Sequence, residues 1–121
     1  MTKENLCRYT LLNGEVERFY KRMAELESTA TNSSILEVNN FEVQIETAWA
    51  EMRKICNAIN SLNDPMERVV LHMRYTDAEI GRLTPWKEIA KWMYGKASEK
   101  NMQAVFRLHK RALERIEKVA Q

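Results

Sequence analysis

The chain has 121 residues, a length that suits one small domain, or one core with a helical appendage, and is too short for two independent hydrophobic cores. It contains only 3 glycines and 2 prolines, and it lacks alternating runs of β-branched and aromatic residues between turn residues. These features predict an all-α fold. The formal net charge of +2 neither favours nor excludes binding to nucleic acid.

The positive charge is gathered in the second half of the sequence. Residues 1–62 carry 7 basic and 9 acidic side chains, whereas residues 63–121 carry 12 and 8. Between residues 82 and 118, 10 basic residues stand against 4 acidic ones, which gives a local net charge of +6. A concentration of positive charge in one segment is what contact with phosphate groups requires.

The two cysteines and the overall hydropathy bear on the cellular compartment. Cys7 and Cys56 lie far apart, without a Cys-x-x-Cys pair or a nearby histidine, so we expect reduced, packed cysteines instead of a disulfide or a metal site. No segment has the pattern of a signal peptide, and no run of about 18 apolar residues could span a bilayer. We therefore expect a cytoplasmic protein without a membrane partner.

The first predicted element is a long helix at about 3–28. Its apolar residues recur at steps of three and four, close to the spacing of a coiled-coil seam. They are Leu6, Tyr9, Leu12, Val16, Phe19, Met23 and Leu26. Packing of this stripe on the chain's own domain is the favoured interpretation, and a homodimer through the N-terminal helices is the alternative.

A polar segment at 28–34, STATNSS, predicts a chain reversal before a second long helix at about 41–62. That helix has its own apolar stripe. The stripe consists of Ile45, Ala48, Trp49, Met52, Ile55, Cys56, Ile59 and Leu62. Two long helices joined by a short connection predict an antiparallel hairpin over residues 1–62 that hides both stripes.

A third helix is predicted to begin at Pro65. Asp64 can cap it, Pro65 suits the first helical position, and Glu67 can reach back to complete a capping box. Its inward face should consist of Met66, Val69, Val70 and Met73. Residues 76–83 fit either a loop or a short helical turn.

The next helix is predicted over the segment WKEIAKWMY. Thr84 can cap it, Pro85 can occupy its first position, and Gly95 can end it in the left-handed conformation. The expected buried side consists of Trp86, Ile89, Ala90 and Met93. Trp92 lies beside this stripe, where packing and contact with a partner are about equally supported.

The last helix, at about 99–119, should begin after a cap at Ser98. One side is apolar: Met102, Val105, Phe106, His109, Ala112, Leu113 and Ile116, with Leu108 at its border. The other side is polar and mostly basic: Lys100, Gln103, Arg107, Lys110, Arg111 and Glu114. The spacing keeps each set on neighbouring turns of one helix.

The sequence contains no pattern that carries known catalytic chemistry. It has no Gly-rich phosphate loop, no His-Glu-x-x-His and no nucleophile elbow. His72 and His109 both lie in apolar helical patterns, which favours packed neutral histidines over catalytic or metal-binding ones. We therefore expect no enzyme activity, no catalytic residues, no metal and no cofactor.

Three segments, DPMERVVLHMRY, PWKEIAKWM and VFRLHKRALERI, together resemble the helix-turn-helix domain of sigma-70 region 4. Within that group they look most like the small regulators of phages and prophages, including the ArpU- and RinA-type late transcription regulators. The resemblance covers about the last sixty residues. It is carried by Arg68–Leu71, Arg74, Tyr75, Trp86, Ile89, Ala90, Val105–His109, Ala112 and Leu113. It implies a helix-turn-helix domain at 63–121 behind the hairpin, in the cytoplasm of a bacterial host cell.

The resemblance also implies a role for individual residues. Gln103 and Arg107 fall where region 4 domains contact bases of double-stranded DNA, while Lys100, Lys110 and Arg111 would face phosphates. Three features differ from the family. The connection at 95–101 and the link at 76–83 are longer, and Phe106 is apolar where many members are polar.

The sequence is also compatible with two other functions. A small phage protein with this scaffold could bind RNA polymerase, or inhibit another host or phage protein, through the hairpin, Trp92 or Phe106. A DNA-packaging subunit would share a helical DNA-binding domain but assemble into a ring.

Overall fold

The computed structural model describes residues 1–28 and 32–119, and its regular structure is entirely helical. The elements are α1 (Lys3–Glu27), α2 (Asn32–Asn60), α3 (Pro65–Leu71), the π-helical turn η1 (His72–Thr76), α4 (Trp86–Tyr94) and α5 (Glu99–Ile116). The prediction of an all-α fold is confirmed. Part of the predicted chain reversal, residues 29–31, lies outside the described residues.

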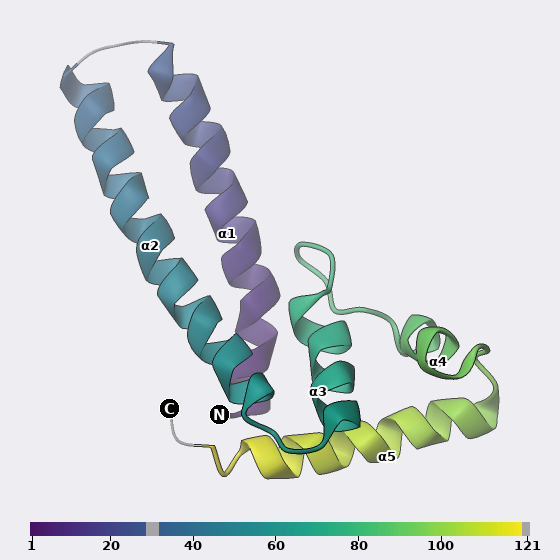
Figure 1. Cartoon of the computed structure of the whole chain (residues 1–121). Coiled ribbons are helices and arrows are strands. Elements are labelled where there is room, and N and C mark those ends of the chain that lie inside the picture. The colour runs from purple at the N-terminus through teal and green to yellow at the C-terminus, as the bar shows by residue number, and fades with distance from the viewer. Residues whose placement is uncertain (29–31, 120–121) are drawn as a thin grey trace.

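Helices α1 and α2 form an antiparallel hairpin that projects away from the rest of the molecule (Figure 1). The two predicted stripes face each other, and Leu6, Val16, Ile45 and Ile59 are buried between them. The apolar side of α1 considered for self-association is therefore covered by α2 of the same chain. Helix α2 begins at Asn32, well before the predicted residue 41, and the predicted apolar stripe, which starts only at Ile45, did not mark its first turns.

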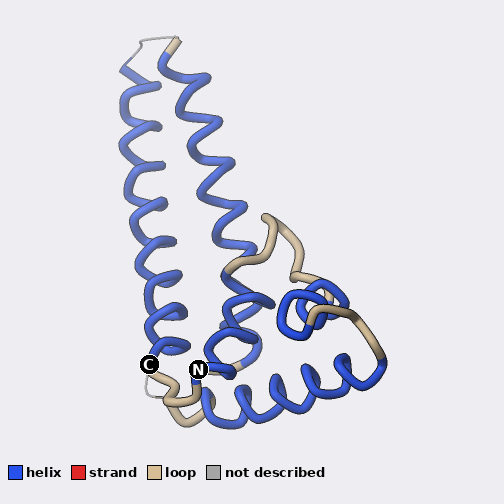
Figure 2. The backbone as a smooth tube through the Cα atoms, turned by 45° about the vertical axis from the view of Figure 1, so that its right-hand side comes forward, coloured by secondary structure: helices blue, strands red, loops and turns tan. Residues whose placement is uncertain are grey.

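The C-terminal helices pack at the base of the hairpin. Helix α5 lies across the bottom of the molecule and contacts both α3 and α4, an arrangement that the tube in Figure 2 shows from a second side. The turn η1 contacts α1. Leu6 of α1, Leu71 of α3 and Ile116 of α5 are all fully buried in the same core, which is continuous from the hairpin to the last helix.

The start of α3 agrees with the prediction, but its inward face agrees only in part, since Val70 is buried and Met73 packs against the core while Met66 does not. The Asp64 carboxylate accepts a hydrogen bond from the Met66 amide at 2.9 Å, and Pro65 occupies the first turn. The capping-box role predicted for Glu67 is wrong, since this side chain is fully buried and binds Arg115. The predicted inward Met66 is 42% exposed, and Leu71 takes its place in the core.

Residues 77–85 form a loop, which settles the alternative left open by the sequence. Arg74 holds its far end, because its guanidinium donates to the Thr84 carbonyl at 2.7 Å while the Thr84 amide donates to the Arg74 carbonyl at 3.2 Å. The loop also lies against α1: a Cβ atom at Gly14 would come within 3.1 Å of Ile80. Close approach of the loop therefore explains a glycine inside a long helix.

The start of α4 differs from the prediction by one residue. The helix begins at Trp86, Pro85 precedes it, and no side chain caps its first turn. The cap predicted at Thr84 is wrong, since the Thr84 backbone is instead bound to Arg74.

The connection between α4 and α5 is short and fixed by hydrogen bonds. Gly95 ends α4 in the left-handed conformation with φ of 85°, and the Ser98 hydroxyl caps α5 by accepting from the Asn101 amide, as predicted. Asn101 also donates to the Lys96 carbonyl at 2.9 Å, which fixes the turn. Helix α5 begins at Glu99, as the cap at Ser98 predicted, so the connection consists of residues 95–98, and the turn counted as 95–101 in the comparison with region 4 includes the first three residues of α5. A turn of this length is usual between the two helices of a helix-turn-helix.

Candidate nucleic-acid interface

The outward side of α5 brings together the five residues that the sequence singled out for DNA. Lys100, Gln103, Arg107, Lys110 and Arg111 are all exposed. The opposite side of the same helix supplies core residues with no exposed surface: Val105, Ala112 and Ile116. Helix α5 therefore has one side fixed to the core and one charged side available to solvent. We call these five residues the basic face.

Part of the basic face borders a shallow groove of about 530 Å³. It is lined by Asp64, Met66, Tyr94, Ala104, Arg107, Leu108, Lys110, Arg111 and Glu114. Two carboxylates lie among its cations, and Asp64 approaches Arg111 at 3.7 Å. Because this pair is exposed to solvent, its attraction is weak and Arg111 can exchange Asp64 for another anion at little cost.

Two groove residues were not anticipated from the sequence. Tyr94 and Met66 are 41% and 42% exposed, and they bring apolar surface to the edge of the basic face. Tyr94 directly precedes the turn glycine Gly95. An aromatic residue at this position, next to the turn, is the sequence feature that could have indicated its place in the groove. For Met66 the sequence predicted the reverse, a buried position, because its place in the helix put it on the expected inward face.

Trp86 connects α4 with α5 and with the segment that follows α3. Its ring packs edge-on against His109 and Phe106, with centroid distances of 4.7 and 5.3 Å. The Arg74 guanidinium lies 4.1 Å from the centre of the indole ring, within the range of a cation–π interaction. Trp86 packs against the core as predicted. Phe106 is 38% exposed, and part of its remaining surface is covered by Trp86.

His109 is a packed neutral histidine. Its Nε2 atom and the Tyr75 hydroxyl share a buried hydrogen bond of 2.7 Å. Burial lowers the pKa of His109 to about 4, and it raises the pKa of Tyr75 to about 12. His72 is half-buried between Thr76 and Asn60, at 2.6 and 2.7 Å, and burial lowers its pKa as well. The predicted role of both histidines as packed residues is confirmed.

The depressed pKa of His109 predicts an acid-sensitive fold. Between the unfolded pKa of about 6.5 and the folded pKa of about 4, the unfolded chain binds a proton that the folded chain does not bind. The contribution to stability is therefore complete above pH 6.5 and is lost as the pH falls. Between pH 7 and pH 5 we expect the loss from His109 to be on the order of 2 kcal/mol.

Urea denaturation of the wild type and of His109→Gln at pH 7, 6 and 5 measures this loss. The glutamine amide keeps a hydrogen-bonding group near Tyr75 but does not titrate. For each protein the free energy of unfolding is plotted against pH. The difference between the two slopes gives the contribution of His109, because His72 is present in both proteins. Parallel pH dependences would contradict this assignment.

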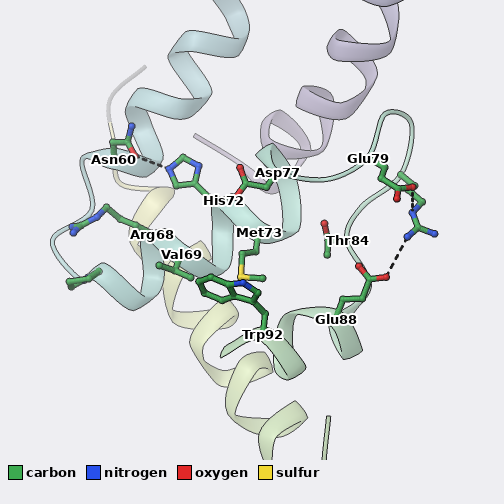
Figure 3. A pocket seen from close by; sticks show the side chains of 12 residues that line it. Asn60, Arg68, Val69, His72, Met73, Asp77, Glu79, Thr84, Glu88 and Trp92 are labelled. Carbon is green, nitrogen blue, oxygen red and sulfur yellow. Dashed lines mark hydrogen bonds and ion pairs between the residues drawn. The ribbon is translucent and has the colours of Figure 1, made fainter. Parts of the chain in front are cut away.

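The two residues considered for partner contact belong to different helices, Trp92 to α4 and Phe106 to α5. Trp92 is 71% exposed and borders a groove of about 910 Å³ between α3, η1, the loop and α4 (Figure 3). The side chains that line the groove are Asn60, Pro65, Arg68, Val69, His72, Met73, Asp77, Glu79, Arg82, Thr84, Glu88 and Trp92. At its rim, Arg82 bridges Glu79 and Glu88 at 3.2 and 3.6 Å. Of the two residues, only Trp92 lines this groove.

The chain was compared with protein families, curated proteins and solved structures, and none of them matches. Within residues 1–28 and 32–119, no three His, Cys, Asp or Glu side chains come together as metal ligands would. None of the helices described has the length and apolar composition needed to cross a bilayer. Both cysteines are free and half-buried.

Proposed function

We propose that the protein is a DNA-binding transcription regulator of phage or prophage type, without enzyme activity. In this proposal α4 and α5 act as a helix-turn-helix, and α5 enters the major groove of double-stranded DNA. The observation that carries the proposal is the basic face: five polar or cationic side chains are exposed on one side of a helix whose other side is held in the core.

The short turn at 95–98 supports this function. In a helix-turn-helix the N-terminal residues of the second helix reach the base edges. The cap at Ser98 and the bond from Asn101 to Lys96 fix the first turn of α5 relative to α4. Gln103 and Arg107 lie one and two turns further along, where an amide and a guanidinium can pair with adenine and guanine.

The remaining cations fit a role in phosphate binding. Lys100, Lys110 and Arg111 flank the two proposed base-contacting residues along α5. Phosphate contacts supply much of the affinity and fix the register of the protein on the duplex, without reading its sequence. Tyr94 and Met66 add apolar surface at the groove edge, which suits contact with sugars or thymine methyl groups.

Two single substitutions separate the proposed roles. Arg107→Ala should weaken binding to the preferred sequence by about 1–3 kcal/mol and relax its selectivity. Lys110→Ala should weaken binding to every sequence equally, so that selectivity is kept. It should also reduce the steepness of log affinity against log salt by about 1. Fluorescence anisotropy with specific and random duplexes over a salt series measures both effects.

Lys21→Ala is the matched control for these variants. Lys21 is an exposed lysine on α1, in the hairpin that projects away from α5 (Figure 1). Its loss should leave affinity and salt slope within experimental error. The DNA-binding proposal would be contradicted if Arg107→Ala and Lys110→Ala behaved like Lys21→Ala on every duplex.

The Trp92 groove favours a second candidate function, binding of another protein such as RNA polymerase. Tryptophan is enriched among residues that dominate protein interfaces, and Trp92 has half-buried Val69 and Met73 beside it in the groove (Figure 3). For this function we expect Trp92→Ala to weaken a complex with purified RNA polymerase by at least about 2 kcal/mol, measured by biolayer interferometry. Equal binding of wild type and Trp92→Ala would remove the groove from consideration.

A further inference from the structure

We propose that the protein forms a two-fold dimer in which the outer sides of two α2 helices pack antiparallel. The surface involved, here termed the outer α2 face, lies on the outward side of α2, and three of its residues, Thr47, Ala50 and Lys54, also border a groove that Met1 and Asn5 line. It consists of Leu36, Glu42, Val43, Glu46, Thr47, Ala50, Arg53 and Lys54. The inference is independent of DNA binding and rests on apolar spacing and charge pattern alone.

An apolar row runs along the middle of this face. Leu36, Val43 and Ala50 recur at intervals of seven residues, so they lie on one side of α2, roughly opposite the buried Ile45 and Ile59. Leu36 is 70% exposed and Val43 is 64% exposed. A shallow groove of about 540 Å³, lined partly by Val43 and Ala50, lies on this side of the helix. An exposed row with heptad spacing is typical of a helix that packs against another helix.

The charges beside this row are divided along the helix. Glu42 and Glu46 lie on its N-terminal half, while Arg53 and Lys54 lie on its C-terminal half. All four side chains are exposed. None of them takes part in an ion pair with another residue of the described chain.

This division of charge identifies the partner as a second copy of the chain. In a two-fold contact the same surface is used by both copies, so it must complement itself. When two α2 helices run antiparallel, the acidic half of each lies opposite the basic half of the other. A parallel arrangement would place like charges opposite each other, which is unfavourable. An unrelated acidic or basic partner would meet charge of its own sign on one half of the face.

The arrangement of the molecule leaves room for this contact. The hairpin projects from the body formed by α3, α4 and α5, and α1 covers only the inner side of α2 (Figures 1 and 2). Two hairpins joined along α2 would make a four-helix arrangement and place the two bodies at opposite ends. The row contains a small residue at Ala50 and few large ones, so we expect a reversible dimer rather than an obligate one.

Charge reversal tests this dimer in the absence of DNA. The first variant, Glu42→Lys with Glu46→Lys, makes the face entirely basic, and the second, Arg53→Glu with Lys54→Glu, makes it entirely acidic. Sedimentation equilibrium at low ionic strength should show a wild-type dimer and a dissociation constant raised at least about tenfold in each variant. An equimolar mixture of the two variants should restore wild-type association, because the opposite faces then attract. Circular dichroism at a protein concentration too low for the dimer should give similar melting curves, since all four positions are exposed and the folded monomer is then compared in each case.

Three results would overturn the dimer. These are a wild type that stays monomeric up to about 1 mM, variants that associate as strongly as the wild type, and a mixture that associates no better than its components. None of them bears on the basic face of α5, so the dimer and the DNA-binding proposal can fail separately.

Discussion

Replacing Arg115 with alanine should lower the free energy of unfolding by about 3 kcal/mol. The Glu67 side chain has no exposed surface, and its Oε2 atom accepts a hydrogen bond of 2.7 Å from Arg115. Its other oxygen has no hydrogen-bond partner in the structure. Without Arg115, a carboxylate would remain buried between α3 and α5 with no compensating charge. Chemical denaturation at pH 7 measures the effect.

Two companion variants show whether the buried carboxylate is the cause. Adding Glu67→Met to Arg115→Ala should recover most of the lost stability, because an apolar side chain of similar size has no charge to compensate. Arg111→Ala removes the other arginine of α5 that is paired with α3, but its partner Asp64 is partly exposed at 3.7 Å. That variant should cost less than about 1 kcal/mol. Equal losses for Arg115→Ala and Arg111→Ala, or no recovery in the double variant, would refute the explanation.

Replacing Trp86 with alanine should also cost about 3 kcal/mol. The substitution removes the aromatic contacts with Phe106 and His109, and it removes the ring over which Arg74 lies. A cavity would remain at the junction of α4, α5 and η1, and neighbouring helices fixed by the shared core could close it only in part. The expected result is a lower denaturation midpoint with an unchanged slope.

Trp92→Ala is a control with the same chemistry on the same helix. Trp92 is 71% exposed, so its truncation should change the free energy of unfolding by no more than about 0.5 kcal/mol. Comparing Trp86→Ala with Trp92→Ala shows whether the loss in free energy of unfolding depends on where the tryptophan lies in the fold. Similar losses in both variants would show that Trp86 does not link α4 to α5 in the way described.

The sequence predicted most helices because local signals and burial agreed there. Asp64 with Pro65, and Ser98 with the residues after it, marked helix starts that the structure confirms. Gly95 marked the end of α4 for a reason that is purely local: it adopts φ of 85°, which other residues rarely adopt. The basic face could also be predicted from the sequence, because the helical period of 3.6 residues is enough to separate it from the buried side of α5.

Other features depend on long-range contacts that no local pattern reveals. Glu67 suits a capping box by its position, and its burial becomes favourable only because Arg115, 48 residues later, reaches it. Glycine is a poor helix former, and Gly14 is accounted for only by the loop at Ile80, which lies against it in the fold. In the comparison with region 4 the turn between α4 and α5 was counted as residues 95–101, although the last three of those residues already belong to α5.

The Tyr94 and Met66 edge of the groove is the part of the site that only the fold supplies. Residues from α3, α4 and α5 meet there, and they are far apart in sequence. Their role in the proposed DNA contact can therefore be tested independently of the basic face, which belongs to a single helix.

In the proposed function, the basic face of α5 reads double-stranded DNA. The most direct test is selection of bound duplexes from a random pool at two salt concentrations, with wild type and Arg107→Ala in parallel. We expect the wild type to enrich one motif at both salt concentrations, total retention to fall as salt rises, and Arg107→Ala to lose selectivity at a position of that motif. Absence of any enriched motif with the wild type, together with retention that does not change with salt, would contradict the claim.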